Sequence, residues 1–115
     1  MALDAAHNLL FIGCKNPATL RMINTQTGKD MHSIACAGDA DDVFYYAADS
    51  LVFVSGGKGF IDVFKAGNEL QRINHIETSS GARTSLLLPS QKTILLAVPA
   101  RSGNSAALWK YKINE

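Results

Sequence analysis

A segment of eight residues recurs three times along this chain at a constant interval. Residues 5–12, 47–54 and 89–96 each combine a short polar turn with a solid apolar run, and successive copies lie 42 residues apart. A short strand-like segment precedes each turn. Repeats of about 20–50 residues are typical of solenoids, propellers and other arrays, in which each repeat is one supersecondary unit. This interval therefore constrains the fold more than any other feature of the sequence.

The second repeat predicts four strands of graded polarity. They are Val43–Tyr46, Leu51–Val54, Phe60–Lys65 and Leu70–Ile76, and turn residues such as Gly56-Gly57-Lys58-Gly59 separate them. The second strand is apolar at every position, as expected for a strand covered on both faces, whereas the fourth is mostly polar. Four antiparallel strands in about 42 residues, with apolar strands in the middle and a polar last strand, are typical of a β-propeller blade.

Two other fold classes fit the sequence less well than the propeller. The apolar segments are too short for helices, which need roughly ten or more residues. An all-β sandwich fits the strand lengths but does not explain why the pattern returns after 42 residues. The predicted fold class is therefore all-β: a β-propeller fragment of about three four-stranded antiparallel blades. These fall in residues 1–36, 43–77 and 85–113, and the last blade lacks its outer strand.

The repeats resemble those of a known family. Leu51–Gly57 followed by Ile61–Phe64 resembles the YVTN β-propeller repeat, and Leu10–Gly13 with Leu20–Lys29 is similar to a second copy. The third copy, in residues 94–111, is looser and has a longer intervening loop. The WD40 and kelch signatures are absent, since the sequence contains no Trp-Asp dipeptide.

The resemblance implies a propeller fold but says little about activity. Proteins with such repeats include bacterial surface-layer proteins, YncE-like periplasmic proteins and the propeller parts of redox enzymes such as cytochrome cd1. Full-length relatives imply a periplasmic or secreted location, although Met1–Asp4 has no feature of a signal peptide.

The length of 115 residues holds fewer than three complete repeats. Propellers have about four to eight blades, so we expect this chain to be the C-terminal part of a larger propeller whose remaining blades lie elsewhere. Self-association into a homo-oligomeric ring is the alternative, although no spare strand is available to seal one blade to the next. The unpaired outer edge at residues 107–113 is an expected aggregation risk.

Candidate binding residues lie in the loops that would face the mouth of a propeller channel. Lys15, Lys58 and Arg101 recur at intervals of 43, which gives one cation per blade. Asp41 and Arg83 occupy equivalent places 42 residues apart, so their opposite charges could form an ion pair or a polar ligand site. The candidate ligand-binding residues are Lys15, Asp41, Asp42, Lys58, Arg83, Thr84 and Arg101. Solvated loop charges are the simpler interpretation of each.

Metal binding and catalysis find little support in the residue pattern. Asp39, Asp41 and Asp42 supply hard oxygen ligands, but the EF-hand pattern is absent and Asp also favours turns. We therefore predict no metal site and no cofactor. The three histidines, His7, His32 and His75, are expected to be exposed, and none forms a recognisable catalytic arrangement.

The two cysteines are predicted to be free thiols. Cys14 and Cys36 end two strands of the first blade that lie two strand spacings apart, which is roughly 9–10 Å. A disulfide cannot span that distance without backbone movement. Small, buried thiols of this kind usually act as core fillers.

Charge and hydropathy narrow the classes of partner. Eleven Lys and Arg residues against ten Asp and Glu give a net charge of +1, which disfavours a nucleic-acid surface. No apolar run approaches the ~18 residues of a membrane span. The rings of residues 44–46 could stack on a base or sugar, but core packing is the simpler interpretation.

Taken with the repeat, these observations favour a scaffold that binds a small ligand or a protein. The alternative is a fragment of a propeller enzyme or redox protein whose catalytic groups lie in other blades. Enzyme activity is therefore uncertain and is the less expected outcome.

Overall fold

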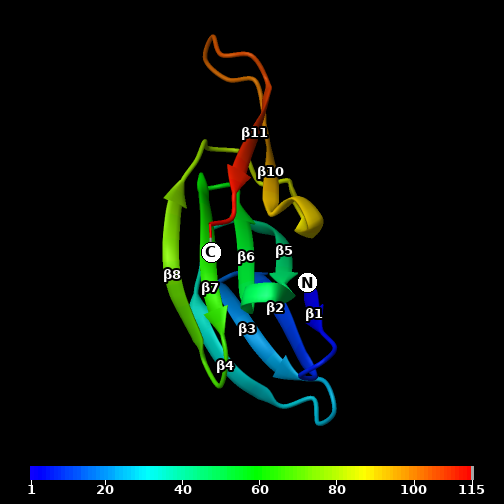
Figure 1. Cartoon of the computed structure of the whole chain (residues 1–115). Helices are drawn as coiled ribbons and strands as arrows, with labels where there is room; N and C mark the ends of the chain where they lie inside the picture. Colours follow the sequence, from blue (N-terminus) through cyan, green and yellow to red (C-terminus); the bar gives the residue numbers. More distant parts are fainter. Residues whose placement is uncertain (115) are drawn as a thin grey trace.

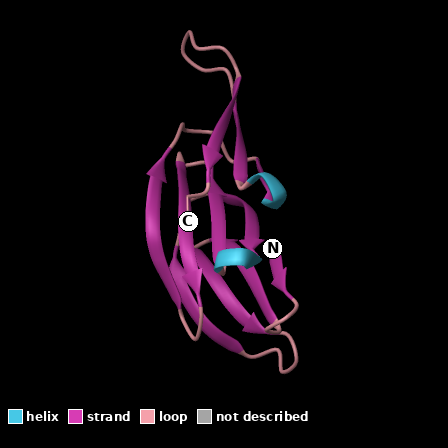
Figure 2. Cartoon of the chain, in the orientation of Figure 1, coloured by secondary structure: helices cyan, strands magenta, loops and turns pink. Residues whose placement is uncertain are grey.

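The computed structural model describes residues 1–114 and consists of three antiparallel sheets with two short 3-10 turns (Figures 1 and 2). The first sheet contains β1 (Ala2–Asp4), β2 (Leu9–Lys15), β3 (Ala18–Asn24) and β4 (Asp30–Ala35). The second contains β5 (Ala40–Tyr46), β6 (Leu51–Gly56), β7 (Phe60–Ala66) and β8 (Leu70–Glu77). The third contains β9 (Ser85–Leu88), β10 (Thr93–Val98) and β11 (Ala107–Lys112). We call these sheets blade 1, blade 2 and blade 3.

Strand order within each blade follows chain order, and every neighbouring pair is antiparallel. Two blades have four strands, and the third has three among residues 1–114. The predicted all-β propeller architecture is therefore confirmed.

The repeat is visible in the backbone as well as in the sequence. Asn8, Ser50 and Lys92 lie 42 residues apart, and each adopts a left-handed conformation, with φ of 56°, 54° and 49°. A positive φ is uncommon for residues other than glycine, so its recurrence marks one turn used three times. The carbonyl oxygens of these three residues also accept equivalent hydrogen bonds, from the backbone N–H groups of Thr25, Ala66 and Ile113 at 2.9, 2.9 and 2.8 Å.

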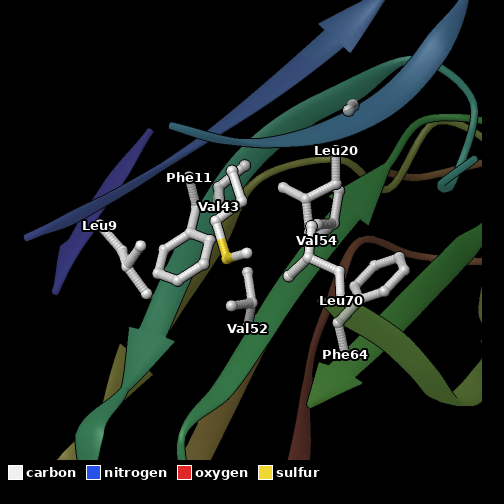
Figure 3. Close-up of a cluster of buried hydrophobic side chains, with 10 residues drawn as sticks. Leu9, Phe11, Leu20, Val43, Val52, Val54, Phe64 and Leu70 are labelled. Carbon is white, nitrogen blue, oxygen red and sulfur yellow. The ribbon is translucent and has the colours of Figure 1, made fainter. Parts of the chain in front are cut away.

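Adjacent blades pack face to face, and each of the two junctions between them contains a hydrophobic core. The first core joins blades 1 and 2 and contains Leu9, Phe11, Leu20, Met22, Ala40, Val43, Val52, Val54, Phe64 and Leu70 (Figure 3). The second joins blades 2 and 3 and contains Tyr46, Leu51, Phe53, Ile61, Val63, Ala82, Leu87, Ile94, Leu96 and Val98. Ring stacking of Phe11 on Tyr45, with centroids 5.3 Å apart, extends the first core.

Strand β6 takes part in both cores. Successive side chains of a strand point to opposite faces, so Val52 and Val54 enter the first core while Leu51 and Phe53 enter the second. All six residues of β6 are buried as a result. The prediction that Leu51–Val54 is covered on both faces is confirmed.

The start of blade 2 differs from the prediction. Strand β5 begins at Ala40 rather than Val43, because a bulge between Ala40 and Asp42 extends its pairing with β6. Asp41 and Asp42 therefore lie on a strand and not in the preceding loop. The bulge displaces one residue without ending the ladder.

Both cysteines are free, as predicted, and both are partly buried rather than fully buried. The pKa of the Cys36 thiol is raised to about 11, chiefly because burial disfavours the thiolate and also because Asp62 and Cys14 lie nearby.

The first core can be tested by truncating Phe64, which is fully buried on β7. We expect Phe64→Ala to lower the free energy of unfolding by about 3–5 kcal/mol, because it removes a buried ring and leaves a cavity. Urea titration followed by circular dichroism measures the change. Ile73→Ala is the control, since Ile73 is 52% exposed, and a loss of about 0.5 kcal/mol or less is expected there. Equal losses in the two variants would contradict the assignment of the core.

Cys36 provides a test of burial that depends on pH. At pH 8 its raised pKa leaves a thiolate fraction roughly a hundredfold lower than that of an unshifted thiol. We therefore expect slow alkylation of Cys36 by iodoacetamide below pH 9, with the rate rising steeply toward pH 11. Mass spectrometry of timed samples gives this profile, and urea-unfolded protein is the control. An identical profile in folded and unfolded protein would show that Cys36 is not shielded.

Candidate ligand-binding loops

Loops from all three blades meet at one end of the molecule. We call this the loop end, and it comprises these loops together with the strand ends that border them, in residues 15–18, 36–42, 56–59, 78–84 and 99–106. Backbone hydrogen bonds join the β6–β7 loop of blade 2 to the connecting segments before and after this blade: Gly57 N–H donates to the Asp39 carbonyl at 2.9 Å, and Gly81 N–H donates to the Gly57 carbonyl at 2.7 Å. The β10–β11 loop projects furthest from the stack (Figure 1).

Asp39 lies at the centre of the loop end. Its Oδ1 is 3.2 Å from Nζ of Lys15, and its Oδ2 accepts hydrogen bonds from Nη2 and Nε of Arg83 at 2.8 and 2.9 Å. Lys15 belongs to blade 1 and Arg83 leads into blade 3, so one carboxylate links the loops of three blades. The hydrogen bond from Lys15 lowers the pKa of Asp39, and the charge of Arg83 adds to this effect. Asp39 is therefore ionised at neutral pH.

A glycine makes room for this ion pair. A Cβ atom at Gly57 would overlap Oδ2 of Asp39 and approach Nε of Arg83 to 2.9 Å. Any larger residue at position 57 would have to displace the Asp39 carboxylate or the Arg83 guanidinium. The run of glycines at residues 56–59 thus serves the contact between blades as well as the turn.

The segment that carries Arg83 is fixed to blade 2 by the buried hydroxyl of Ser55 and the half-buried carboxylate of Asp42. Ser55, which is 1% exposed, donates its hydroxyl to the Arg83 carbonyl at 2.7 Å and lies 2.8 Å from the Ser85 hydroxyl. Asp42 accepts the backbone N–H of Ser85 at 2.7 Å. These bonds hold the Arg83 backbone in place while its side chain reaches Asp39.

The suggested pairing of Asp41 with Arg83 is wrong. Arg83 binds Asp39 instead, and Asp41 accepts a long hydrogen bond of 3.5 Å from the Thr84 hydroxyl. The cause is local backbone geometry: Asp39 adopts a left-handed conformation with φ of 57°, directly before the bulge that starts β5. Sequence reasoning considered Asp39 only as a metal ligand, although its separation from Arg83 is close to the blade repeat.

The remaining candidate cations lie at the same end. Lys58 is exposed, its alkyl chain packs beside Gly38, and its ammonium has no hydrogen bond or ion pair within residues 1–114. Arg101 donates from Nη1 to the Ser80 carbonyl at 3.2 Å. The structure thus places all seven candidate residues at the loop end, while their ligand-binding role stays a prediction.

The histidines make contacts within the fold. His7 is exposed and pairs with Asp4 at 2.7 Å. His32 is half-buried rather than exposed as predicted, because its Nδ1 accepts the backbone N–H of Leu70 at 2.9 Å across the blade junction. Within residues 1–114, no group of three His, Cys, Asp or Glu side chains is arranged to hold a metal ion.

A charged cluster on blade 2 was not foreseen from the sequence. Asp62 on β7 is fully buried and bonds Nδ1 of His75 on β8. Nη1 of Arg72 is 3.7 Å from the other Asp62 oxygen, and the ring of Phe60 stacks on His75 with centroids 4.1 Å apart. The available signal was the single charge inside the apolar segment Phe60–Phe64. The cluster links β7 to β8 next to the loop end, since Phe60 directly follows Gly59.

Comparison with known proteins supports the fold. No family model matches the sequence, and no curated protein matches it. A chain in the structure described as "Crystal Structure of Mitotic Checkpoint Complex" superposes on 91% of this chain with a TM-score of 0.72 and 15% sequence identity. This protein has a β-propeller fold. At that identity the likeness shows the fold alone, and the chain spans 33%, or about one third, of its neighbour's length.

The structure also bears on membrane association. Residues 1–114 contain no helix with the length and hydropathy needed to cross a membrane.

Substitution of Gly57 tests the ion pair at the loop end. We expect Gly57→Ala to displace Asp39 from Arg83 and to raise the lowered pKa of Asp39 toward the ordinary Asp value, as measured by NMR titration of its carboxyl carbon. Gly67→Ala is the matched control, because the nearest atom to a Cβ there is 4.0 Å away. An unchanged Asp39 titration in Gly57→Ala would refute this account.

Proposed function

We propose that the protein is a β-propeller interaction scaffold that binds a protein partner through its loop end. The observation that carries the proposal is the pair of ion pairs that Asp39 forms with Lys15 and Arg83. It joins loops of three blades into one preorganised surface, and preorganisation lowers the entropic cost of binding. Loops held by a rigid scaffold are frequent sites of binding.

Charge at the loop end favours an acidic partner. Lys15 and Arg83 both bind the single carboxylate of Asp39, and Lys58 and Arg101 are the loop-end cations that no carboxylate holds within residues 1–114. Carboxylates on a partner would complement these two groups and guide its orientation.

A hollow next to Arg101 supports protein recognition. It has a volume of about 510 Å³ and is lined by Trp109, Pro99, Ser79 and Asn104, among others. Trp109 is 38% exposed. Trp and Arg are enriched among the residues that contribute most to protein–protein binding. We therefore propose that this hollow receives a side chain of the partner.

The blades are proposed to be of the YVTN type. The support is the pattern of Leu51–Gly57 followed by Ile61–Phe64, which forms β6 and β7 of the most regular blade. A propeller also needs blades beyond these three, so further blades or another copy of the chain are proposed as structural partners.

Charge reversal tests binding through the loop end. The wild-type chain, Lys58→Glu/Arg101→Glu and the control Lys29→Glu/Lys65→Glu are immobilised and exposed to an extract of the source cells. Both doubles change the net charge equally, but Lys65 binds the Asp49 carbonyl at the opposite end of β7. Quantitative mass spectrometry should find a protein retained by wild type and control and at least tenfold depleted on the loop-end variant. Partners lost equally from both variants, or from neither, would overturn the proposal.

A further inference from the structure

The two outer faces of the blade stack are apolar, and within residues 1–114 no other blade packs on them. Blade 2 is packed on both sides, whereas blades 1 and 3 are each packed on one side only. The free face of blade 1 carries Leu3, Leu10, Ile12 and Ile23, and the free face of blade 3 carries Leu86, Leu88, Leu95 and Leu108. Leu3, Leu86 and Leu108 are 57%, 52% and 65% exposed. We call these surfaces the blade 1 end face and the blade 3 end face.

Because the blades are repeats, each end face can be compared with the equivalent face of a blade at the two buried junctions. At both junctions the earlier blade contributes an aromatic residue of its second strand, Phe11 in blade 1 and Phe53 in blade 2. Leu95 occupies the equivalent position in blade 3, on its end face. The blade 3 end face is therefore equivalent to the faces through which blades 1 and 2 pack on the next blade.

The blade 1 end face is of the opposite kind. At both junctions the later blade contributes two aliphatic residues of its second strand, Val52 and Val54 in blade 2 and Ile94 and Leu96 in blade 3. Leu10 and Ile12 occupy these positions in blade 1. The blade 3 end face thus corresponds to the earlier-blade side of a buried junction, and the blade 1 end face corresponds to the later-blade side. The two end faces complement each other, whereas two copies of the same end face do not.

Few charges interrupt the end faces. Arg21 on the blade 1 end face is neutralised by Asp30 on the neighbouring strand. Lys110, paired with Leu95, and Lys112, paired with Thr93, are the charged residues that β11 places on the blade 3 end face. A lysine side chain is long enough to keep its ammonium in water while its alkyl chain covers apolar surface.

We propose that two copies of this chain associate head to tail, with blade 3 of each copy packed on blade 1 of the other. A contact between unlike faces closes into a ring when the rotation per subunit allows it. Two copies supply six blades, within the range of about four to eight found in propellers, whereas three copies would supply nine. Every blade keeps the same orientation in such a ring, so the loop ends of both copies face the same side. The inference does not depend on the function proposed for the loop end.

The mass in solution is the first test. Light scattering after size-exclusion chromatography should give twice the 12.4 kDa of one chain. Leu3→Asp and Leu108→Asp should each give the monomer mass, because each places a carboxylate in one face of the contact. Ile73→Asp is the control: Ile73 is 52% exposed on β8 of blade 2, away from both end faces, and this variant should remain a dimer.

Mixing the two end-face variants tests the head-to-tail geometry. A Leu3→Asp chain keeps an intact blade 3 end face, and a Leu108→Asp chain keeps an intact blade 1 end face. An equimolar mixture should therefore regain the dimer mass through one intact contact. Circular dichroism checks that the strands persist, and Leu3→Ser and Leu108→Ser replace a variant that unfolds.

Three outcomes would overturn the proposal. A wild-type monomer would show that the end faces are covered by other blades or another protein. A dimer that persists in either end-face variant would show a contact elsewhere or between like faces. A mixture that stays monomeric would refute the pairing of blade 1 with blade 3.

Discussion

The packing of blade 2 between its two neighbours is the interaction on which the rest of the structure depends. Strand β6 is buried along its whole length because its alternate side chains enter different hydrophobic cores. Neither core exists without this sheet, and a two-sided apolar strand exposed to water would be an aggregation hazard. The fold is therefore cooperative across blades, as expected when each repeat buries its hydrophobic face only against the next.

Stacked blades deliver their loops to the same end, and this makes the loop end possible. Asp39 meets Lys15 from one side and Arg83 from the other because the hydrophobic cores have already set the spacing between blades. Hydrogen bonds of Ser55 and Asp42 then hold the backbone that carries Arg83. A polar surface on a rigid scaffold of this kind can bind a partner with little reorganisation. The same stacking leaves one apolar face free at each end, and the repeat gives those two faces unlike and matching patterns.

The sequence predicted the strands well where hydrophobic pattern alone decides them. The interval of 42 residues identified three equivalent turns, and the structure shows the same left-handed residue in each, at Asn8, Ser50 and Lys92. The candidate site was predicted less well. Its residues do gather at one end, but the partner of Arg83 is Asp39 and not Asp41. The buried contact of Asp62 with His75 was missed entirely.

The sequence by itself determined the repeat, the order and polarity of the strands and the end of each blade at which the loops lie, because strand periodicity and turn chemistry are local properties. Tertiary structure alone decided which side chains meet across blades. A bulge at Ala40–Asp42 and a left-handed Asp39 change the direction of neighbouring carboxylates, and no periodic pattern records a displacement of one residue. His32 likewise became half-buried because Leu70 of the next blade supplies its hydrogen-bond donor. Contacts between blades depend on the exact backbone geometry, which the order of residues does not express.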